Sequence, residues 1–522
     1  MEILNTDVLV VGGGLTGYRA AAAALETGTK VILVDAGGAS SNSIMGFNAP
    51  VSEDDSPDSF FVDLEKSACE AGKKELRQVM AERAKGQVSY MESLSYSFDR
   101  TSEGEYSLIG VLGFSHPRLV HHGSFTGKEM LVLLKQHTET LGLRVVYGRM
   151  TEIWKNSGEV SGVSGFDKKG CPITINAKAV VLCAGGSSLL PGSTYPKDLC
   201  GDGYMMALRA GATLIDIEFQ QFEPCCYCWP PELRGHLAVT TMLLEGGELK
   251  NGCGKAFVKK RGNHRYQVQK DQLASWIMDE IMSGRATPHG GVWYDITKLP
   301  MERIIKDHEL FWREAMACGI DLTYQQAEVA PAPHTCIGGV RINAECETGV
   351  PGLFCAGENA GGVHGANRVG GCAGTETLVF GEIAGKNASS YAAQIRRRHW
   401  NEERMPDTKP PIGRHEIPST VAKALGFYRD EETLQQGKQF LEAINQGTHS
   451  LVYVQILASL LRKESRGVFH RTDFPKTDPN LNGTNTEIRL DDDGKVIGRL
   501  VREDIQKRSK IRGQKKERTE KV

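Results

Sequence analysis

A glycine-rich turn near the start of the chain is spaced to hold an anion against the peptide backbone. The turn reads Gly12-Gly13-Gly14-Leu15-Thr16-Gly17 and has the pattern GxGxxG. In this pattern the first glycine permits a tight turn, the second lets the backbone approach a pyrophosphate, and the third allows a helix to pack closely on a strand. Asp35 follows Gly17 by about 18 residues, and a carboxylate there can accept hydrogen bonds from a ribose diol. Together these residues predict a dinucleotide site.

The segments around this turn have the periodicity of a strand, a helix and a second strand. Residues 6–11 (TDVLVV) and 30–35 (KVILVD) are short apolar runs, typical of buried parallel strands. The alanine-rich residues 18–28 between them predict a helix, whose N-terminus would face the bound phosphates. This is a complete βαβ unit, and it supports the dinucleotide prediction.

Two later strands also end in glycine, and they favour one dinucleotide over another. Residues 179–186 (AVVLCAGG) include Ala184 and Gly185, and residues 352–358 (GLFCAGE) end at Glu358. Glu358 is placed to bond a ribityl or ribose hydroxyl, although such a residue can instead simply neighbour a helix N-cap. Three separated glycine-ended strands that converge on one ligand suit the long FAD molecule better than NAD. We therefore predict FAD as the cofactor.

The composition is that of an ordinary globular protein and excludes several functions. With 522 residues, 40% hydrophobic and 24% charged, the chain can form two or three domains. A net charge of -2 gives no bulk attraction to nucleic acid or membranes. There is no apolar run long enough to span a bilayer, and a strand pattern begins too early for a signal peptide. These features, with thirteen cysteines in no regular framework, predict a cytoplasmic location and reduced thiols.

The order of the patterns predicts an α/β fold with an interrupted first domain. Residues 223–335 contain several helices and few long apolar strands, so we expect an inserted second domain there. Buried-strand patterns flank it, which assigns residues 1–222 and 336–395 to one discontinuous domain. A polar, proline-bearing linker and a helical C-terminal region, residues 410–522, follow. The basic residues 507–521 are interpreted as a solvated tail, with docking to a partner as the alternative.

Seven motifs occur in an order that resembles one protein family. They are VVGGGLTG near the N-terminus, HHGSFTGKEM (121–130), GDGYMMALRAGA (201–212), EFQQFEP (218–224), APHTCIGGV (332–340), VPGLFCAGENAGGVHGANRVGG (350–371) and LLRKESRGVFHRTDFP (460–475). The chain resembles the flavoprotein subunits of fumarate reductase and succinate dehydrogenase, and the related L-aspartate oxidases and adenylylsulfate reductases. The likeness covers most of residues 5–475.

This resemblance implies a Rossmann-like FAD-binding domain, an inserted α+β capping domain and a helical C-terminal region. Thr126, Gly127 and Asp202, like Asp35 and Glu358, match motif positions associated with FAD binding. In the family, hydride passes between flavin N5 and a dicarboxylate held under the cap. Many members pass electrons to an iron–sulfur subunit, which is therefore a candidate partner here, whereas aspartate oxidases act as soluble oxidases.

The resemblance also assigns substrate-binding residues. His334 matches the histidine that bonds a substrate carboxylate, although a histidine there can also be a satisfied core residue. Arg368 matches the substrate-binding arginine, whose planar guanidinium can clamp a carboxylate with two hydrogen bonds, although a structural salt bridge would also explain it. His364 is expected to shape the flavin pocket.

The chain departs from the family at several positions. Glu223 replaces the histidine of a QFHP motif, and we take it as a third catalytic candidate. The RD-type motif aligns with Lys270-Asp271, which leaves Ser275 where we expect the catalytic arginine. A TEG-type acid is replaced near Thr240. A plain dicarboxylate would meet an uncompensated charge at Glu223, so we hypothesise that the substrate keeps one carboxylate and has a neutral or cationic second end.

Three further features bear on the chemistry of the site. Arg234 and His236 could replace the missing proton donor, or they could form an exposed loop. Cys225-Cys226-Tyr227-Cys228 contains CxxC, for which buried structural thiols are favoured over a redox dithiol or a metal ligand pair, so no metal is predicted. The first histidine of the chain is His116, far beyond the position where some family members attach flavin, so the FAD is predicted to be non-covalent.

Three functions fit these patterns. The first is an FAD-dependent reductase or dehydrogenase that acts on a C–C bond next to a carboxylate. The second is an amino-acid oxidase of the L-aspartate oxidase kind, in which a substrate amine would pair with Glu223. The third is a flavin-bearing electron-transfer subunit without a substrate of its own, against which the retention of His334 and Arg368 argues.

Overall fold

A parallel sheet with one antiparallel excursion forms the larger part of the molecule. The computed structural model describes residues 2–37, 44–195, 199–258, 268–395, 406, 414–444 and 450–502. Its six-stranded sheet comprises β1 (Glu2–Val11), β2 (Val31–Asp35), β5 (Arg144–Asn156), β6 (Glu159–Asp167), β7 (Pro172–Leu182) and β14 (Leu353–Cys355). β1 pairs in parallel with both β2 and β7, and β14 pairs in parallel with β7. The central strands are buried on both faces, which explains their continuous apolar sequences.

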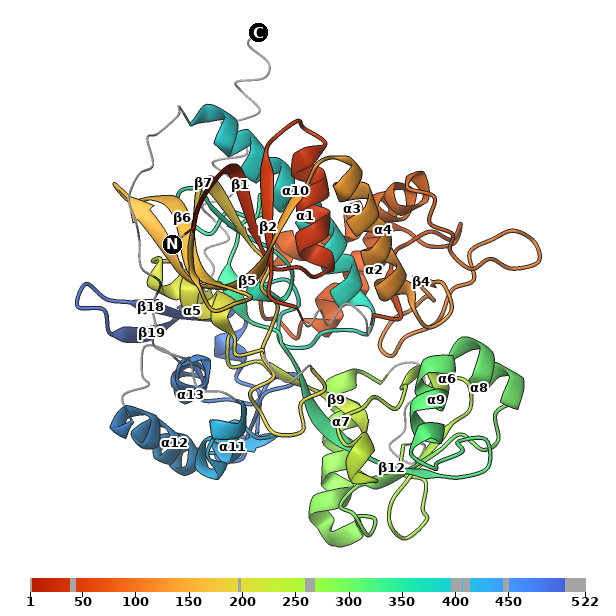
Figure 1. Cartoon of the computed structure of the whole chain (residues 1–522). Coiled ribbons are helices and arrows are strands. Elements are labelled where there is room, and N and C mark those ends of the chain that lie inside the picture. Colours follow the sequence, from red (N-terminus) through yellow and green to blue (C-terminus); the bar gives the residue numbers. More distant parts are fainter. Residues whose placement is uncertain are drawn as a thin grey trace.

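Helices pack on this sheet and on one another (Figure 1). They are α1 (Leu15–Leu25), α2 (Pro57–Ser67), α3 (Lys74–Ser93), α4 (Thr126–Thr140), α5 (Asp202–Arg209) and α10 (Cys372–Gln394), with the short antiparallel pair of β3 (Gly46–Asn48) and β4 (Leu119–His121) beside them. α1 and α10 approach closely because small residues line their contact. A Cβ on Gly385 of α10 would overlap the carbonyl oxygen of Ala20. This contact fixes the two helices whose N-termini border the site described below.

A second lobe is built from the chain between the two halves of the first (Figure 1). Its antiparallel sheet has the order β10 (Glu248–Lys250), β11 (Val292–Asp295), β12 (Ala327–Cys336), β9 (Gln220–Tyr227). Its helices are η2 (Pro231–Leu233), α6 (Thr241–Leu244), α7 (Lys270–Glu280), η5 (Ile281–Arg285), α8 (Met301–Asp307) and α9 (Glu309–Ala317). A separate hydrophobic cluster fills it. The adjacent strands β9 and β12 enter and leave this lobe, and the predicted boundaries at 223 and 335 fall within them.

The C-terminal region contains helices, as predicted, and also a strand pair that was not predicted. The helices are η7 (Arg414–Glu416), α11 (Ser419–Ala424), α12 (Glu431–Ala443), α13 (Leu451–Leu461) and η8 (Pro479–Leu481), with the short parallel pair β16 (Tyr428–Arg429) and β17 (His470–Arg471). The expectation of helix fails for β18 (Thr484–Leu490) and β19 (Val496–Arg502), which form a hairpin. An acidic turn, Asp491-Asp492-Asp493-Gly494, joins the two strands. The basic residues 507–521 lie outside the described residues.

This hairpin extends a sheet of the first lobe. The order of that sheet is β15 (Ala360–Gly361), β13 (Gly339–Arg341), β8 (Leu214–Ile215), β18, β19, with η6 (Gly357–Asn359) just before β15. The α/β fold with a Rossmann-like domain is thus confirmed, and the C-terminal region is joined to that domain by strand pairing. Within the described residues, no helix combines the length and the apolar character needed to cross a membrane.

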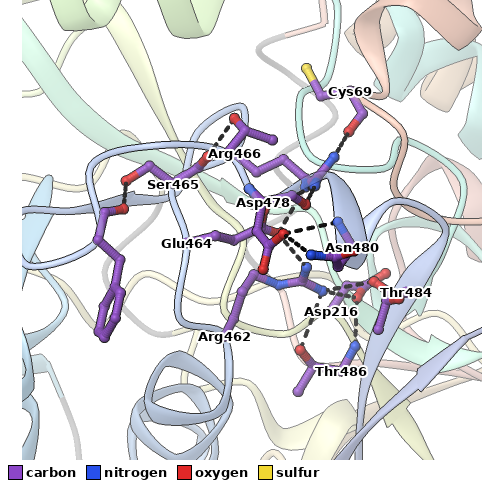
Figure 2. Close-up of polar contacts among 12 residues, drawn as sticks. Cys69, Asp216, Arg462, Glu464, Ser465, Arg466, Asp478, Asn480, Thr484 and Thr486 are labelled. Carbon is purple, nitrogen blue, oxygen red and sulfur yellow. Dashed lines mark hydrogen bonds and ion pairs between the residues drawn. The ribbon is translucent and has the colours of Figure 1, made fainter.

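Buried ion pairs also attach the C-terminal region (Figure 2). Arg462, directly after α13, donates to the carboxylates of Glu218, Glu464 and Asp216 at 2.6, 2.9 and 3.3 Å. Arg466 pairs with Glu464 and donates to the carbonyl of Cys69 at 2.8 Å. Asp216 and Glu218 lie between β8 and β9, on the segment that leads into the second lobe. The network therefore joins three parts of the chain at one buried point.

Candidate active site

Two adjoining cavities follow the carboxyl ends of the parallel strands. Gly14, Cys183 and Gly185 line both, so the cavities form one elongated channel. One end lies beside Asp35 and the other lies between the two lobes, beside His334. In open α/β sheets ligands bind in this position, outside the carboxyl ends of the strands.

The glycine-rich turn forms the middle of the channel. Gly12 has φ +126°, and a Cβ on it would overlap the carbonyl of Cys183, while a Cβ on Gly17 would overlap the carbonyl of Gly12. α1 begins directly after Gly14 and no side chain caps it, so its first amide groups remain donors for an anion. Leu15 and Thr16 line the channel, whereas Gly17 serves the packing of α1 on β1. These features fit a pyrophosphate.

Carboxylates flank the outer end of the channel. Asp35 lines it at the end of β2, and its Oδ1 accepts a hydrogen bond from the amide of Gly37 at 2.8 Å. Asp202 also lines it, and it forms a two-pronged ion pair with Arg149 at 2.7 and 2.8 Å. A carboxylate can accept hydrogen bonds from a nucleotide ribose, and the uncapped N-terminus of α1 can bind the pyrophosphate. The residues therefore fit the predicted FAD.

The glycine-ended strands β7 and β14 meet at the inner part of the channel. Asn359 joins them, because it accepts from the amide of Ala184 and donates to the carbonyl of Gly185, both at 2.6 Å. Glu358 lines the channel and accepts hydrogen bonds from the Tyr195 hydroxyl at 2.8 Å and the Cys336 amide at 3.2 Å. Burial raises the pKa of Glu358 to about 7.

The N-terminus of a second helix borders the inner cavity. α10 starts after Gly371, no side chain caps it, and Gly370, Gly371 and Ala373 line the cavity. Its amide donors and the positive end of its dipole favour negative charge there. An electron-rich ring system would be stabilised at this position.

Thr126 and Gly127 do not reach the channel. Both are buried at the start of α4 and line neither cavity. The Thr126 hydroxyl donates to the carbonyl of Met45 at 2.5 Å, and the Gly127 amide donates to the carbonyl of Ile44 at 2.8 Å. Ile44 and Met45 do line the inner cavity. Thr126 and Gly127 thus support the segment that lines the cavity, and their part in binding FAD stays a prediction.

The three predicted catalytic residues lie together at the inner cavity. His334, Arg368 and Glu223 all line it, although they come from β12, the segment before α10, and β9. The distance from His334 Nε2 to Glu223 Oε2 is 3.9 Å. Arg368 is 6% exposed and has no carboxylate within 4 Å among the described residues. Its guanidinium can therefore bind an incoming anion.

Lys270 is a fourth charged residue of this cluster, and sequence reasoning missed it. It begins α7, lines the cavity, and its Nζ lies 2.5 Å from Glu223 Oε2. The expectation that Glu223 presents an uncompensated charge is therefore wrong, because a buried lysine neutralises it. Lys270 occupies the first position of the RD-type motif, so the aligned motif already contained the signal.

His334 is held in a fixed orientation. Its Nδ1 lies 2.6 Å from the Thr194 hydroxyl, and its ring stacks on Tyr195 with centroids 5.6 Å apart and planes 13° apart. Burial, and then the positive charges of Arg368 and Lys270, lower the pKa of His334 well below its ordinary value. The ring is therefore neutral near pH 7 and can donate only one hydrogen bond. Nothing in the sequence pointed to Thr194 or Tyr195.

Other candidates lie elsewhere. Ser275 does not line the cavity, and its hydroxyl lies 3.3 Å from His470 Nε2. Arg234 and His236 are exposed and line neither cavity, and His236 pairs with Glu314 at 3.1 Å. They are therefore not placed to donate a proton in the cavity. His364 lines it and bonds Glu376 at 2.9 Å, in the structural role expected.

The CxxC cysteines show no sign of a redox or metal site. Cys225, Cys226 and Cys228 are unpaired thiols, and the first two are buried in β9. Burial raises the pKa of Cys225 and Cys226, which disfavours the reactive thiolate. Across the ranges that the structure describes, no cluster of three or more His, Cys, Asp or Glu side chains could hold a metal ion.

Comparison with known proteins identifies the relatives of this chain. A family model described as FAD binding domain matches residues 7–373. One subunit of fumarate reductase (CoM/CoB) from Methanothermobacter marburgensis is 31% identical over 526 residues, covering 92% of this chain and 96% of that protein. L-aspartate oxidase of Vibrio cholerae is 26% identical, covering 90% and 96%. The structure of Mycobacterium smegmatis Sdh1 in complex with UQ1 gives a TM-score of 0.79 at 29% identity, covering 97% of this chain and 95% of that one.

Proposed function

The chain belongs to the FAD binding domain family, as an FAD-dependent oxidoreductase related to L-aspartate oxidase and to fumarate reductase, and on this premise we propose that it reduces or forms a C–C double bond next to a substrate carboxylate. One observation supports this most strongly. Arg368, His334 and the Lys270–Glu223 pair lie around one cavity, which is continuous with the channel suited to FAD. The cluster thus combines an anion-binding group and a proton donor beside the cofactor.

Arg368 would bind the substrate carboxylate. A buried guanidinium without an acidic partner attracts an anion strongly, and its planar shape matches the two carboxylate oxygens. Neutral His334 would donate one hydrogen bond to the same substrate, and its contacts with Thr194 and Tyr195 hold it in position. Together these contacts would orient the double bond toward the cofactor.

Lys270 would supply the proton. Bound FAD supplies the hydride in the direction of reduction or accepts it in the direction of oxidation. In reduction, one alkene carbon receives the hydride while Lys270 Nζ protonates its neighbour, and solvent then reprotonates the lysine. Glu223, at 2.5 Å, fixes the direction of the Lys270 side chain. Lys270 would thus supply the proton in place of the catalytic arginine expected at the position of Ser275.

The second lobe would act as the cap. We propose that residues 223–335 close over the substrate, because Glu223, Lys270 and His334 all lie on this lobe or at its edge and line the cavity. We also propose that electrons reach the flavin through an iron–sulfur partner. The relative from Methanothermobacter marburgensis is itself one subunit of its enzyme, which is consistent with a multisubunit assembly.

Substitution of Lys270 tests this proposal. Because general acid catalysis contributes about 10²- to 10⁴-fold, Lys270→Met should lower kcat for enoate reduction by that factor. Lys270→Arg, which keeps a charged donor, should retain much more of the rate. Reduced viologen dye can serve as electron donor, and flavin absorbance of each purified variant reports FAD content. Wild-type kcat in a Lys270→Met protein that retains FAD would contradict the role.

An amino-acid oxidase remains the second candidate. Glu223 favours it, because a buried carboxylate could pair with a substrate ammonium in place of Lys270. The 26% identity to L-aspartate oxidase over most of the chain also agrees with it. Hydrogen peroxide formed on addition of L-aspartate in air would support the oxidase, whereas its absence together with enoate reduction would support the reductase.

A further inference from the structure

An apolar wall of the inner cavity points to a particular substrate class. Resting on the proposed function, we infer that the substrate is a monocarboxylate whose second end is apolar, such as a 2-enoic acid with an alkyl or aryl group on C3. This differs from a dicarboxylate, and it replaces the cationic end considered from the sequence.

Four large apolar side chains from the second lobe and the loop before β4 form a wall of the cavity. Leu112, Val239 and Phe311 are 4, 7 and 4% exposed, and Leu237 is half-buried. All four line the cavity. Phe311 lies on α9, and Leu237 and Val239 lie on the segment between η2 and α6. A substrate end that enters this region contacts mainly hydrocarbon.

The side chains of this wall belong to a packed core, which restricts their rotation. Leu112, Val239 and Phe311 are members of the hydrophobic cluster that fills the second lobe, and Leu237 packs against the same cluster. Rotating these side chains away from the cavity would require displacing well-packed neighbours. The apolar character of the wall is therefore a fixed property of the site.

The charges of the cavity leave one position for a carboxylate. Among the described residues that line it, Lys270 is paired with Glu223, and His364 is paired with Glu376. His334 is neutral. Arg368 remains as the cation without an acidic partner. A second substrate carboxylate would have to lie against the apolar wall or beside Lys270, whose charge Glu223 already compensates, so neither position offers it an unpaired cation.

Two threonines of the second lobe also line the cavity. Thr240 and Thr241 line the cavity at the start of α6. Hydroxyl groups can hydrogen-bond a substrate, but they do not neutralise a full negative charge in a buried site. They are therefore compatible with an uncharged substituent. The lining thus favours one anionic end at Arg368 and one uncharged, mainly apolar end.

The reaction balances for such a substrate. Bound FAD, once reduced, would supply a hydride to C3 of the 2-enoate, Lys270 would give a proton to C2, and the C2–C3 double bond would become single. The products are the saturated acid and oxidised FAD, and the electrons come from the donor that reduces the flavin.

A matched series of substrates tests the inference on the wild-type protein. Fumarate, crotonate and a 2-enoate with a longer alkyl or aryl group on C3 are compared as oxidants, with reduced viologen dye as donor. Burying one apolar side chain contributes about 1.5–3 kcal/mol, or about 10- to 100-fold in binding. We expect kcat/KM for the apolar-substituted enoate to exceed that for fumarate by at least about tenfold. If fumarate is the best substrate, the inference fails while the proposed function stands. If the protein holds FAD but reduces none of the enoates, the proposed function fails as well.

Two variants make the test specific to the wall. Leu237→Arg places a cation on the apolar surface at a half-buried position, and it should shift the ratio of kcat/KM toward fumarate by about tenfold or more. Tyr324→Ser is the control, because Tyr324 is 69% exposed and does not line the cavity, and it should leave the ratio unchanged. An FAD-containing Leu237→Arg protein with the wild-type ratio would show that the wall does not contact the substrate. The wild-type series decides the inference even if this variant does not fold.

Discussion

His470 is a half-buried ionisable residue whose protonation opposes folding. It stacks on Phe427 with ring centroids 4.7 Å apart, and its Nε2 lies 3.3 Å from the Ser275 hydroxyl on α7. Burial is the main cause that lowers its pKa to about 4, Arg429 lowers it further, and Asp279 opposes the shift. In the unfolded chain the pKa of a histidine is about 6.5. The stabilisation from neutral His470 is therefore complete above pH 6.5 and is lost as the pH falls toward 4.

The lowered pKa of His470 gives a prediction for stability in acid. His470→Phe keeps the ring contact with Phe427 but removes the titrating group. Between pH 7 and pH 4.5 the wild-type free energy of unfolding should fall by about 2 kcal/mol more than that of the variant. Urea unfolding of both proteins at the two pH values measures this difference, because carboxylate titrations common to both cancel. Equal losses in the two proteins would mean that His470 titrates normally.

Individual residues of the site differ in how far the sequence could predict them. Arg368, His334 and Glu223 lie within long motifs, and the structure places all three on one cavity. Lys270 was visible in the aligned motif, but its ion pair with Glu223 depends on the distance between β9 and α7, which no local pattern encodes. Thr194 and Tyr195 lie in a segment without periodicity, so their contacts with His334 could not be predicted.

At the scale of elements, the C-terminal region is held by charge as well as by strand pairing. Arg462 is fully buried and contacts three carboxylates, two of them on the segment between β8 and β9. Figure 2 shows how this network also reaches Thr484 and Thr486 of β18. Its geometry satisfies the buried charges only while all partners are present.

Removal of one partner should therefore be costly. Arg462→Met should lower the free energy of unfolding by about 3–5 kcal/mol, since it leaves buried carboxylates without their cation. Arg499→Met is the matched control, because Arg499 pairs with Glu487 on the same hairpin but its side chain is 62% exposed. The control should lose less than about 1 kcal/mol. Chemical denaturation of both variants measures the two values, and similar losses would show that burial of the network has no special effect.

Sequence periodicity predicted some elements better than others. The βαβ unit was predictable because β1, α1 and β2 are continuous in sequence and β1 and β2 are buried on both faces. The hairpin of β18 and β19 was not, because β18 is paired with the two-residue strand β8 from a distant part of the chain. The hairpin is stabilised by a tertiary contact, and local strand propensity does not reveal such a contact.

At the scale of the whole molecule, the site exists only where the two lobes meet. The first lobe contributes Arg368, the N-termini of α1 and α10, and the glycine-ended strands. The second contributes Lys270, Glu223 and the apolar wall. The interruption of the first domain by the second could be predicted from the return of buried-strand patterns. The sequence could not predict that side chains of the two lobes face each other across one cavity. This arrangement depends on how β9 and β12 cross from one lobe to the other.

The central claim is that FAD lies in this channel and exchanges hydride with an unsaturated carboxylate held by Arg368. The most direct test mixes the fully reduced holoprotein anaerobically with a 2-enoate and follows the flavin absorbance. The account predicts that the oxidised flavin spectrum returns with one saturated acid formed per flavin. Flavin that stays reduced with every unsaturated carboxylate, yet is reoxidised by another electron acceptor, would contradict it.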